Sequence, residues 1–238
     1  MRLRWVPGLL GLVAAVLVLA AGPGTRFGLW NYRTGFSALR WGAYAGLAAA
    51  AVAVLLLIIR PRSGGVIPLV LGLVLGLGAA FVPWRWMQQA RRVPPIHDIT
   101  TDLDRPPKFV AVLPLRAEAP NPATYGGSEV ADAQRRSYPD IKPLLLGVPA
   151  GAAYSRALAS ARGMGWELVA TDSTTGRIEA TATTPWFGFK DDVVVRVRPE
   201  GPGSRIDVRS VSRVGKSDVG ANAQRIRTYL ADVASRKS

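Results

Sequence analysis

The sequence predicts three membrane-spanning helices followed by an α+β domain, in which two helices flank an antiparallel sheet of four or slightly more strands. Two observations predict this fold class. Three uncharged apolar stretches lie within the first 84 of the 238 residues, and each has about the 20 residues that a helix needs to cross a bilayer. After residue 149 the hydrophobic pattern is helical, then alternates as in strands, and then becomes helical again.

The predicted membrane anchor covers residues 1–86. Its three spans run over about residues 5–25, 41–59 and 63–84. No acidic residue or lysine interrupts them, so no buried charge indicates an ion or proton path. The spacings Gly42-x-x-x-Gly46 and Gly72-x-x-x-Gly76 are typical of close helix packing. The link from Arg60 to Gly65 is short and predicts a tight helix hairpin.

The orientation of the anchor depends on its arginines. The first span could be a cleaved signal peptide, but two further spans follow it and Arg26-Phe27 is a poor cleavage context. With the N-terminus in the cytoplasm, four arginines flank the spans inside and six outside, so a plain count favours the opposite topology. The first helix usually dominates, and Arg2 and Arg4 precede it. We therefore expect a cytoplasmic N-terminus and an exported soluble domain.

Residues 87–149 are rich in proline and predict an extended segment that packs on the domain, with a strand at Lys108–Leu115. Disorder is the alternative. Apolar residues are interspersed along this segment more densely than a free linker requires. They include Ile96, Phe109, Val110, Val112, Tyr138 and Ile141.

The α+β core is predicted over residues 150–238. Ala153, Tyr154, Ala157, Leu158, Ala161 and Met164 have helical spacing. Alternating patterns predict strands at Trp166–Thr171, Gly176–Thr183, Asp192–Arg198 and Arg205–Arg213. A closing helix is expected from about Val219 to Ala234, with Val219, Ala223, Ile226, Tyr229, Leu230 and Val233 as its buried stripe.

Gly215-Lys216-Ser217 has the sequence that ends a phosphate-binding loop. Such a loop also requires a glycine five positions before Gly215, where this chain has Ser210, and residues 211–214 continue a strand pattern. The sequence instead predicts that Ser217 or Asp218 caps the closing helix and that Gly220 permits close approach of another backbone.

Composition excludes several classes of function. The chain has no cysteine and one histidine, which rules out thiolate chemistry and limits metal sites, so we expect no metal and no cofactor. The formal charge is +14, and the first 84 residues hold seven arginines and no acid, which indicates contact with the lipid bilayer and its anionic headgroups. The soluble part lacks nucleic-acid-binding motifs, so we expect no nucleic acid partner.

One face of the second predicted hairpin gathers arginines. They are Arg196, Arg198, Arg205, Arg209 and Arg213. If Arg198 lies opposite Arg205, Arg196 opposes Asp207 and Val194 opposes Arg209, which leaves one cross-strand ion pair among unpaired cations. This excess predicts an anion-binding site for a lipid headgroup, an acidic polysaccharide or an acidic protein. A solvated strand face is the alternative.

A second polar group is His97 with Asp98 and Asp102, which Asp140 could join from elsewhere in the sequence. It is the basis of an alternative function, an envelope hydrolase with an acid/base centre. Local turns in a proline-rich segment explain these residues more simply. Asp191 and Asp192 are neighbours in a strand and point to opposite faces, so they cannot act as a catalytic pair. Catalysis is therefore not indicated.

Four blocks of the soluble part resemble the DUF1499 family of proteins of unknown function. They are IHDITTDLDRPPKF, RRSYPDIKPL, GWELVATDSTTGRIEATATTPWFGFKDDVVVRV and DVRSVSRVGKSDVGANAQRI, and they extend over about residues 94–233. The resemblance implies a bacterial envelope protein and no catalytic residues. We therefore expect a protein of the bacterial inner membrane with a periplasmic domain that binds an anionic envelope component or a partner protein.

Overall fold

The computed structural model describes residues 2–59 and 65–236 and divides into two compact units. The first unit contains the residues up to Arg91 together with Pro185–Gly188, and the second contains the rest of the described chain. The tight link predicted from Arg60, and the expected start of the third span at Ser63, lie outside the described residues.

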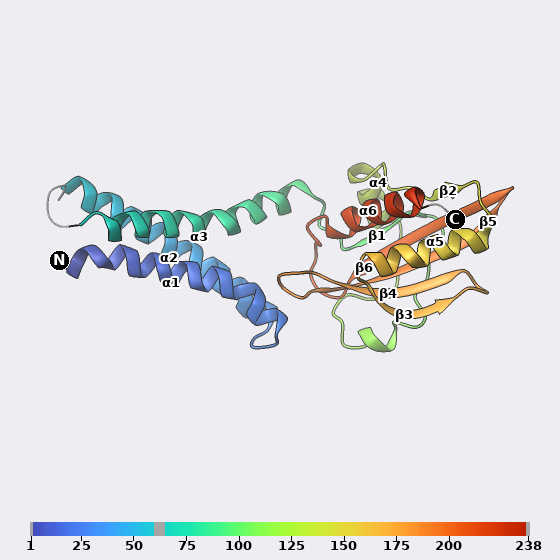
Figure 1. Cartoon of the computed structure of the whole chain (residues 1–238), viewed down its shortest axis with the longest axis horizontal. Helices are drawn as coiled ribbons and strands as arrows, with labels where there is room; N and C mark the ends of the chain where they lie inside the picture. The colour runs from blue at the N-terminus through green and yellow to red at the C-terminus, as the bar shows by residue number, and fades with distance from the viewer. Residues whose placement is uncertain (1, 60–64, 237–238) are drawn as a thin grey trace. The chain divides into compact units, whose positions relative to one another are not determined.

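Three long helices form the first unit (Figure 1). They are α1 (Arg2–Arg26), α2 (Tyr32–Ile59) and α3 (Ile67–Arg92). Each is long and apolar enough to cross a membrane. Helix α2 begins before the predicted span at Trp41, and α3 continues beyond Trp84. A helix satisfies its own backbone, so it can continue into the polar interface.

Glycines set the close contacts between these helices. A side chain at Gly46 would collide with the backbone of Gly76, and one at Gly76 would collide with the backbone of Gly46. Gly72 faces Pro7 of α1 in the same way. The predicted small-residue packing is therefore confirmed.

The second unit is built on a six-stranded antiparallel sheet. Its strands are β1 (Asp98–Thr100), β2 (Leu144–Leu146), β3 (Glu167–Asp172), β4 (Arg177–Thr183), β5 (Lys190–Glu200) and β6 (Gly203–Ser212). The order is β1-β6-β5-β4-β3, and β2 also pairs with β6. The four predicted strands are present, and the two short ones extend the sheet along the free edge of β6.

Helices α5 (Ala150–Gly163) and α6 (Ala221–Ser235) lie on one face of the sheet (Figure 1). Their apolar stripes bury the central valines of β5, and Ala157, Ile226 and Tyr229 are fully buried, as the spacing predicted. Val219 was expected in this stripe, but it precedes α6 and is 39% exposed.

The chain between β1 and α5 is only partly extended, since it contains the 3₁₀ helix η1 (Pro114–Arg116) and α4 (Gly127–Ser137). The strand predicted at Lys108–Leu115 is wrong: these residues form no strand and end in a turn that leads into η1. The buried carboxylate of Glu179 accepts the backbone N–H groups of Val110 and Val112. The Glu179 side chain thus provides the hydrogen-bond acceptors that a neighbouring strand would otherwise provide.

Candidate functional site

The arginines of β5 and β6 lie on the sheet face opposite α5 and α6. Val195, Val197 and Val208 belong to the core under the helices, so strand alternation directs the intervening residues to the other face. In the observed register Arg198 pairs with Arg205, Arg196 with Asp207 and Val194 with Arg209. The predicted register is therefore confirmed.

Asp207 is the centre of a buried ion-pair network on this face. Its side chain is fully buried and lies 2.8 Å from Nη2 of Arg196 and 2.9 Å from Nε of Arg205, with Arg198 at 3.6 Å. Asp102, from the loop after β1, lies 2.9 Å from Arg196 and 3.1 Å from Arg205. The prediction of one ion pair among unpaired cations is wrong, because a distant loop supplies a second carboxylate.

This environment keeps the network charged. Burial acts to raise the pKa of Asp102, but the backbone N–H of Arg105 and the charges of Arg205 and Arg196 together hold that pKa below its usual value. Burial acts to lower the pKa of Arg205, but its hydrogen bond to Asp207 and the charges around it raise that pKa. Asp102 therefore stays ionised at neutral pH.

Arg209 forms a separate, deeply buried pair. Its Nε lies 2.9 Å from Oδ1 of Asp98 and its Nη2 lies 2.7 Å from Oδ2. The guanidinium lies over the rings of Phe109 and Tyr125, at 5.2 and 5.4 Å from their centroids. Only 3% of the Arg209 side chain is exposed, so this arginine supports the fold and offers no surface to a ligand.

Arg213 also forms an ion pair inside the domain. Asp192 is fully buried and accepts hydrogen bonds from Arg213 at 2.8 Å, from Arg116 of η1 at 2.7 Å and from the hydroxyl of Thr181 at 2.8 Å. The hydrogen bond to Asp192 raises the pKa of Arg213, and burial lowers the pKa of Arg116. Among the five predicted arginines, the most exposed are Arg196, Arg198 and Arg205, at 29%, 30% and 21%.

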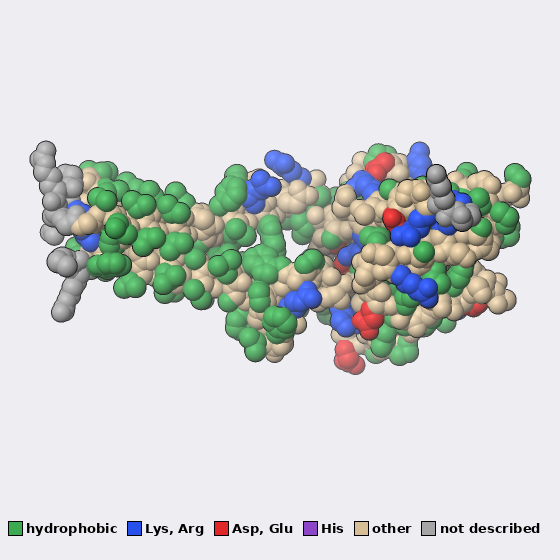
Figure 2. Space-filling view, viewed as in Figure 1, with side chains coloured by type: hydrophobic (Ala, Val, Ile, Leu, Met, Phe, Trp, Pro, Cys, Tyr) green, Lys and Arg blue, Asp and Glu red, His purple; other side chains and the backbone are tan. Residues whose placement is uncertain are grey.

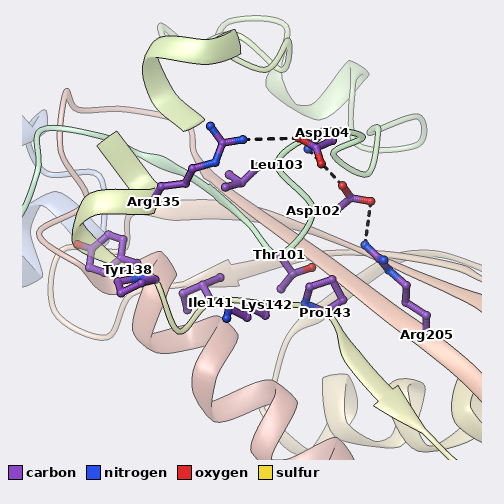
Figure 3. Close-up of a pocket in the computed structure, with 11 residues that line it drawn as sticks. Thr101, Asp102, Leu103, Asp104, Arg135, Tyr138, Ile141, Lys142, Pro143 and Arg205 are labelled. Carbon is purple, nitrogen blue, oxygen red and sulfur yellow. Dashed lines mark hydrogen bonds and ion pairs between the residues drawn. The ribbon is translucent and has the colours of Figure 1, made fainter. Parts of the chain in front are cut away.

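Arg205 also borders an open cleft of about 380 Å³ (Figure 3). The other lining residues come from the loop after β1, from α4 and from the turn before β2. They are Thr101, Asp102, Leu103, Asp104, Arg135, Tyr138, Pro139, Ile141, Lys142 and Pro143. Figure 3 shows Asp104 and Asp102 between the guanidinium groups of Arg135 and Arg205. Lys142 is exposed and forms no ion pair with any other described residue.

The structure does not assemble the predicted cluster of His97, Asp98, Asp102 and Asp140. Asp98 binds Arg209, Asp102 binds Arg196 and Arg205, and Asp140 lies 2.6 Å from Arg227 of α6. Nδ1 of His97 lies 3.5 Å from the carbonyl oxygen of Lys216. Within residues 2–59 and 65–236, no group of three histidine or acidic side chains could hold a metal ion.

The structure also shows a polar network under α6 that the sequence reading missed. Asn222 is fully buried, donates to the carbonyl of His97 and the hydroxyl of Ser212, and accepts from Ser210 at 2.7 Å. Arg225 bridges Ser210 to Asp191. The sequence offered one indication of this network. Side chains of a strand alternate between its two faces, so Ser210 and Ser212 both point towards the apolar layer of helices, where their hydroxyls need polar partners.

The turn with Gly215-Lys216-Ser217 leads into α6. The carboxylate of Asp218 accepts the N–H groups of Gly220 at 2.8 Å and Asn222 at 2.7 Å. Asp218 thus accepts a backbone N–H of the first turn of α6 as predicted, but the N-cap residue itself is Gly220. Gly220 has a φ of +85°, so the left-handed backbone explains this glycine better than the close approach we expected. Val219, a β-branched residue, has a φ of +55°, which is a strained conformation.

The family comparison covers the part of the chain that holds this site. The sequence profile described as "Protein of unknown function (DUF1499)" matches residues 98–233. The match begins at β1, includes the whole sheet and its ion pairs, and ends in α6. No curated protein matches the chain. Because the profile covers more than half of the sequence, the chain belongs to the DUF1499 family.

Proposed function

We propose that this protein is held in the membrane by α1, α2 and α3 and binds an anionic envelope component at the cleft beside Arg205. The observation that supports binding is the convergence of Arg205, Lys142 and Arg135 on an open cleft with two carboxylates. Three cations and two anions give a net positive charge. Such a site favours a phosphate or a carboxylate.

The cleft is suited to a charged group on a carbon skeleton. Arg135 lies 3.6 Å from Asp104 and 2.8 Å from Asp132 of its own helix, and all three side chains are more than half exposed. These pairs are therefore weak, and a competing anion can open them. Within residues 2–59 and 65–236, Lys142 forms no ion pair that an incoming anion would have to break. The side chains of Tyr138, Ile141 and Pro143 form an apolar part of the cleft wall. The preferred ligand is a phosphate- or carboxylate-bearing polyol, as in a lipid headgroup or an acidic polysaccharide.

The proposal includes an orientation. Arg2 and Arg4 at the start of α1 support a cytoplasmic N-terminus, and an odd number of spans then brings the soluble domain to the periplasm of a bacterial cell. A C-terminal alkaline phosphatase fusion should be active and a green fluorescent protein fusion should be dark. The reverse pattern would overturn the orientation and leave the cleft proposal standing.

Binding can be tested with the full chain in phosphatidylcholine nanodiscs, which carry no net lipid charge. The probes are glycerol 3-phosphate and a galacturonate oligomer, and the affinity for each is measured by titration calorimetry. Lys142→Glu reverses an unpaired charge and leaves the ion pairs of Arg205 intact. We expect it to weaken binding of the preferred probe at least tenfold. Lys108→Glu is the matched control, since Lys108 is also exposed but lies outside the cleft.

Three results would oppose this function. Equal binding by wild type and Lys142→Glu would show that the cleft is not the site. Absence of measurable binding of both probes at low salt would exclude the proposed ligand class. A bound protein partner with unchanged affinity in Lys142→Glu would point to a different surface.

A further inference from the structure

A second cavity lies on an exposed side of α2 and α3, within the helical unit, whose visible face in Figure 2 carries mostly hydrophobic side chains. It is a groove of about 880 Å³, which is within the usual range of roughly 300–1,000 Å³ for ligand sites. Its walls are almost entirely apolar. They consist of Phe36, Leu39, Arg40, Ala43, Tyr44 and Leu47 from α2, and of Leu77, Gly78, Ala80, Phe81, Pro83, Trp84 and Met87 from α3.

The groove begins next to the point where the two helices touch. Gly46 and Gly76 meet backbone to backbone, and the groove runs from the adjacent Leu47 and Leu77 towards the start of α2 and the end of α3. Pro83 lies in this stretch of α3. It cannot donate a helical hydrogen bond, and prolines inside helices commonly bend them.

Gly78 lies in the groove wall with open space beside it. A Cβ atom added at this glycine would meet no heavy atom within 4 Å. This distinguishes it from Gly46, Gly72 and Gly76, where an added Cβ would collide with a neighbouring helix. Gly78 therefore leaves volume in the groove and is not needed for helix contact.

Among the described residues that line the groove, Arg40 is the one that carries a charge. It is exposed, lies over the edge of Trp41 with its Cζ 6.0 Å from the ring centroid, and forms no ion pair with any other residue in the described ranges. The uncharged run of α2 from Trp41 to Ile59 has the length of the hydrocarbon core. Arg40 is then at the headgroup level, and Leu47 and Leu77 lie among the acyl chains.

We propose that this groove binds one anionic phospholipid, with its acyl chains along α2 and α3 and its phosphate at Arg40. The apolar wall matches acyl chains, and the single unpaired cation at the interfacial end matches a negative headgroup. A docked helix is less well matched, because helix interfaces in membranes favour small residues, whereas Phe36, Tyr44, Phe81 and Trp84 form much of this wall.

Native mass spectrometry of the full chain tests this proposal. The protein is released from mixed micelles that contain equal amounts of phosphatidylglycerol and phosphatidylcholine, and the retained lipid is counted. Wild type should retain one phosphatidylglycerol per chain with at least tenfold preference. Gly78→Phe fills the groove and should lose most retention of both lipids. Arg40→Gln should keep retention and lose the preference for phosphatidylglycerol.

Val74→Phe is the control for Gly78→Phe. It adds a ring on α3 at a position that is 61% exposed and outside the groove, so it should retain lipid as wild type does. Equal retention in Gly78→Phe and Val74→Phe, with matching helical circular dichroism, would overturn the proposal. So would an unchanged lipid preference in Arg40→Gln. A wild-type protein that is dimeric, and whose dimer is lost in Gly78→Phe while lipid retention is unaffected, would show that a helix of a second copy occupies the groove.

The groove and the cleft near Lys142 are tested independently. Lys142→Glu should leave phosphatidylglycerol retention unchanged. Gly78→Phe in phosphatidylcholine nanodiscs should leave the affinity for the soluble probe unchanged. Failure of one proposal is therefore distinguishable from failure of the other.

Discussion

Arg209 and Asp98 form a two-point ion pair whose side chains are 3% and 6% exposed, with N–O distances of 2.9 and 2.7 Å. The pair connects β6 to β1, the strand nearest in sequence to the anchor. Its position between Phe109 and Tyr125 excludes water. Arg209, which the sequence places on the predicted binding face, is thus buried inside the domain.

Removal of one partner from this pair should be costly. Arg209→Ala leaves the carboxylate of Asp98 buried and uncompensated, which costs about 3–5 kcal/mol. The melting temperature of the full chain in detergent should fall by roughly 6–20 °C. Arg136→Gln, at an exposed site without an ion pair among the described residues, should change it little. Equal melting temperatures for the two variants would contradict the structural role.

The stability of the domain should depend on the ionisation of Asp102. Its pKa is lowered in the folded protein, so the unfolded chain takes up this proton first as the pH falls below about 4. The contribution of Asp102 is therefore complete above that pH and is lost as the pH falls through the folded pKa. In the Asp102→Asn variant, the free energy of unfolding should decrease less steeply as the pH falls. Asp104→Asn, at a side chain 88% exposed, should leave the decline as in wild type.

Glu179 should hold the covering segment in place. Its buried carboxylate accepts N–H groups of Val110 and Val112 at about 3.0 Å, and loss of such an acceptor costs about 1–3 kcal/mol for each buried donor. Glu179→Ala should speed hydrogen exchange at both amides and open residues 108–116 to proteolysis. Glu118→Gln, at an exposed glutamate on the same segment, is the control. Unchanged exchange at Val110 would show that the carboxylate is dispensable.

Substitution of Val219 by a residue that tolerates a positive φ should stabilise the protein. Its φ of +55° costs a β-branched residue about 1–2 kcal/mol, and its side chain is 39% exposed. Val219→Asn should raise the melting temperature, because asparagine tolerates this conformation. Val219→Ala keeps a Cβ atom and should give no comparable gain. A lower melting temperature for Val219→Asn would indicate that the valine side chain makes a necessary contact.

His97→Ala separates binding from hydrolysis. The imidazole lies at a long 3.5 Å from the carbonyl oxygen of Lys216 and does not line the cleft. The variant should keep both its melting temperature and its affinity for the soluble probe. A variant that folds normally but loses function in a complementation assay would favour the hydrolase hypothesis.

Much of the fold follows from local patterns in the sequence. Strict alternation in β5 and β6, joined by a short turn, sets the register in which Arg196 opposes Asp207. The uncharged runs determine the three helices, and the spacing of Ala153, Ala157 and Ala161 determines the buried side of α5.

The site itself was less predictable, because its contacts join residues that are far apart in sequence. Asp102 is 94 residues from Arg196, and Glu179 is 67 residues from Val112. No periodic pattern relates such positions. The strand residues of this face carry an excess of positive charge. Carboxylates and backbone groups from distant loops pair with these cations, and the result is a network of alternating positive and negative charges.

The place of β1 has a consequence for biogenesis. Asp98 is translated soon after α3, but its partner Arg209 follows 111 residues later. Until β6 has been synthesised, β1 and β2 have no strand to pair with. The sheet can therefore be completed only after β6 emerges from the ribosome, and during that interval chaperones can reach the nascent chain.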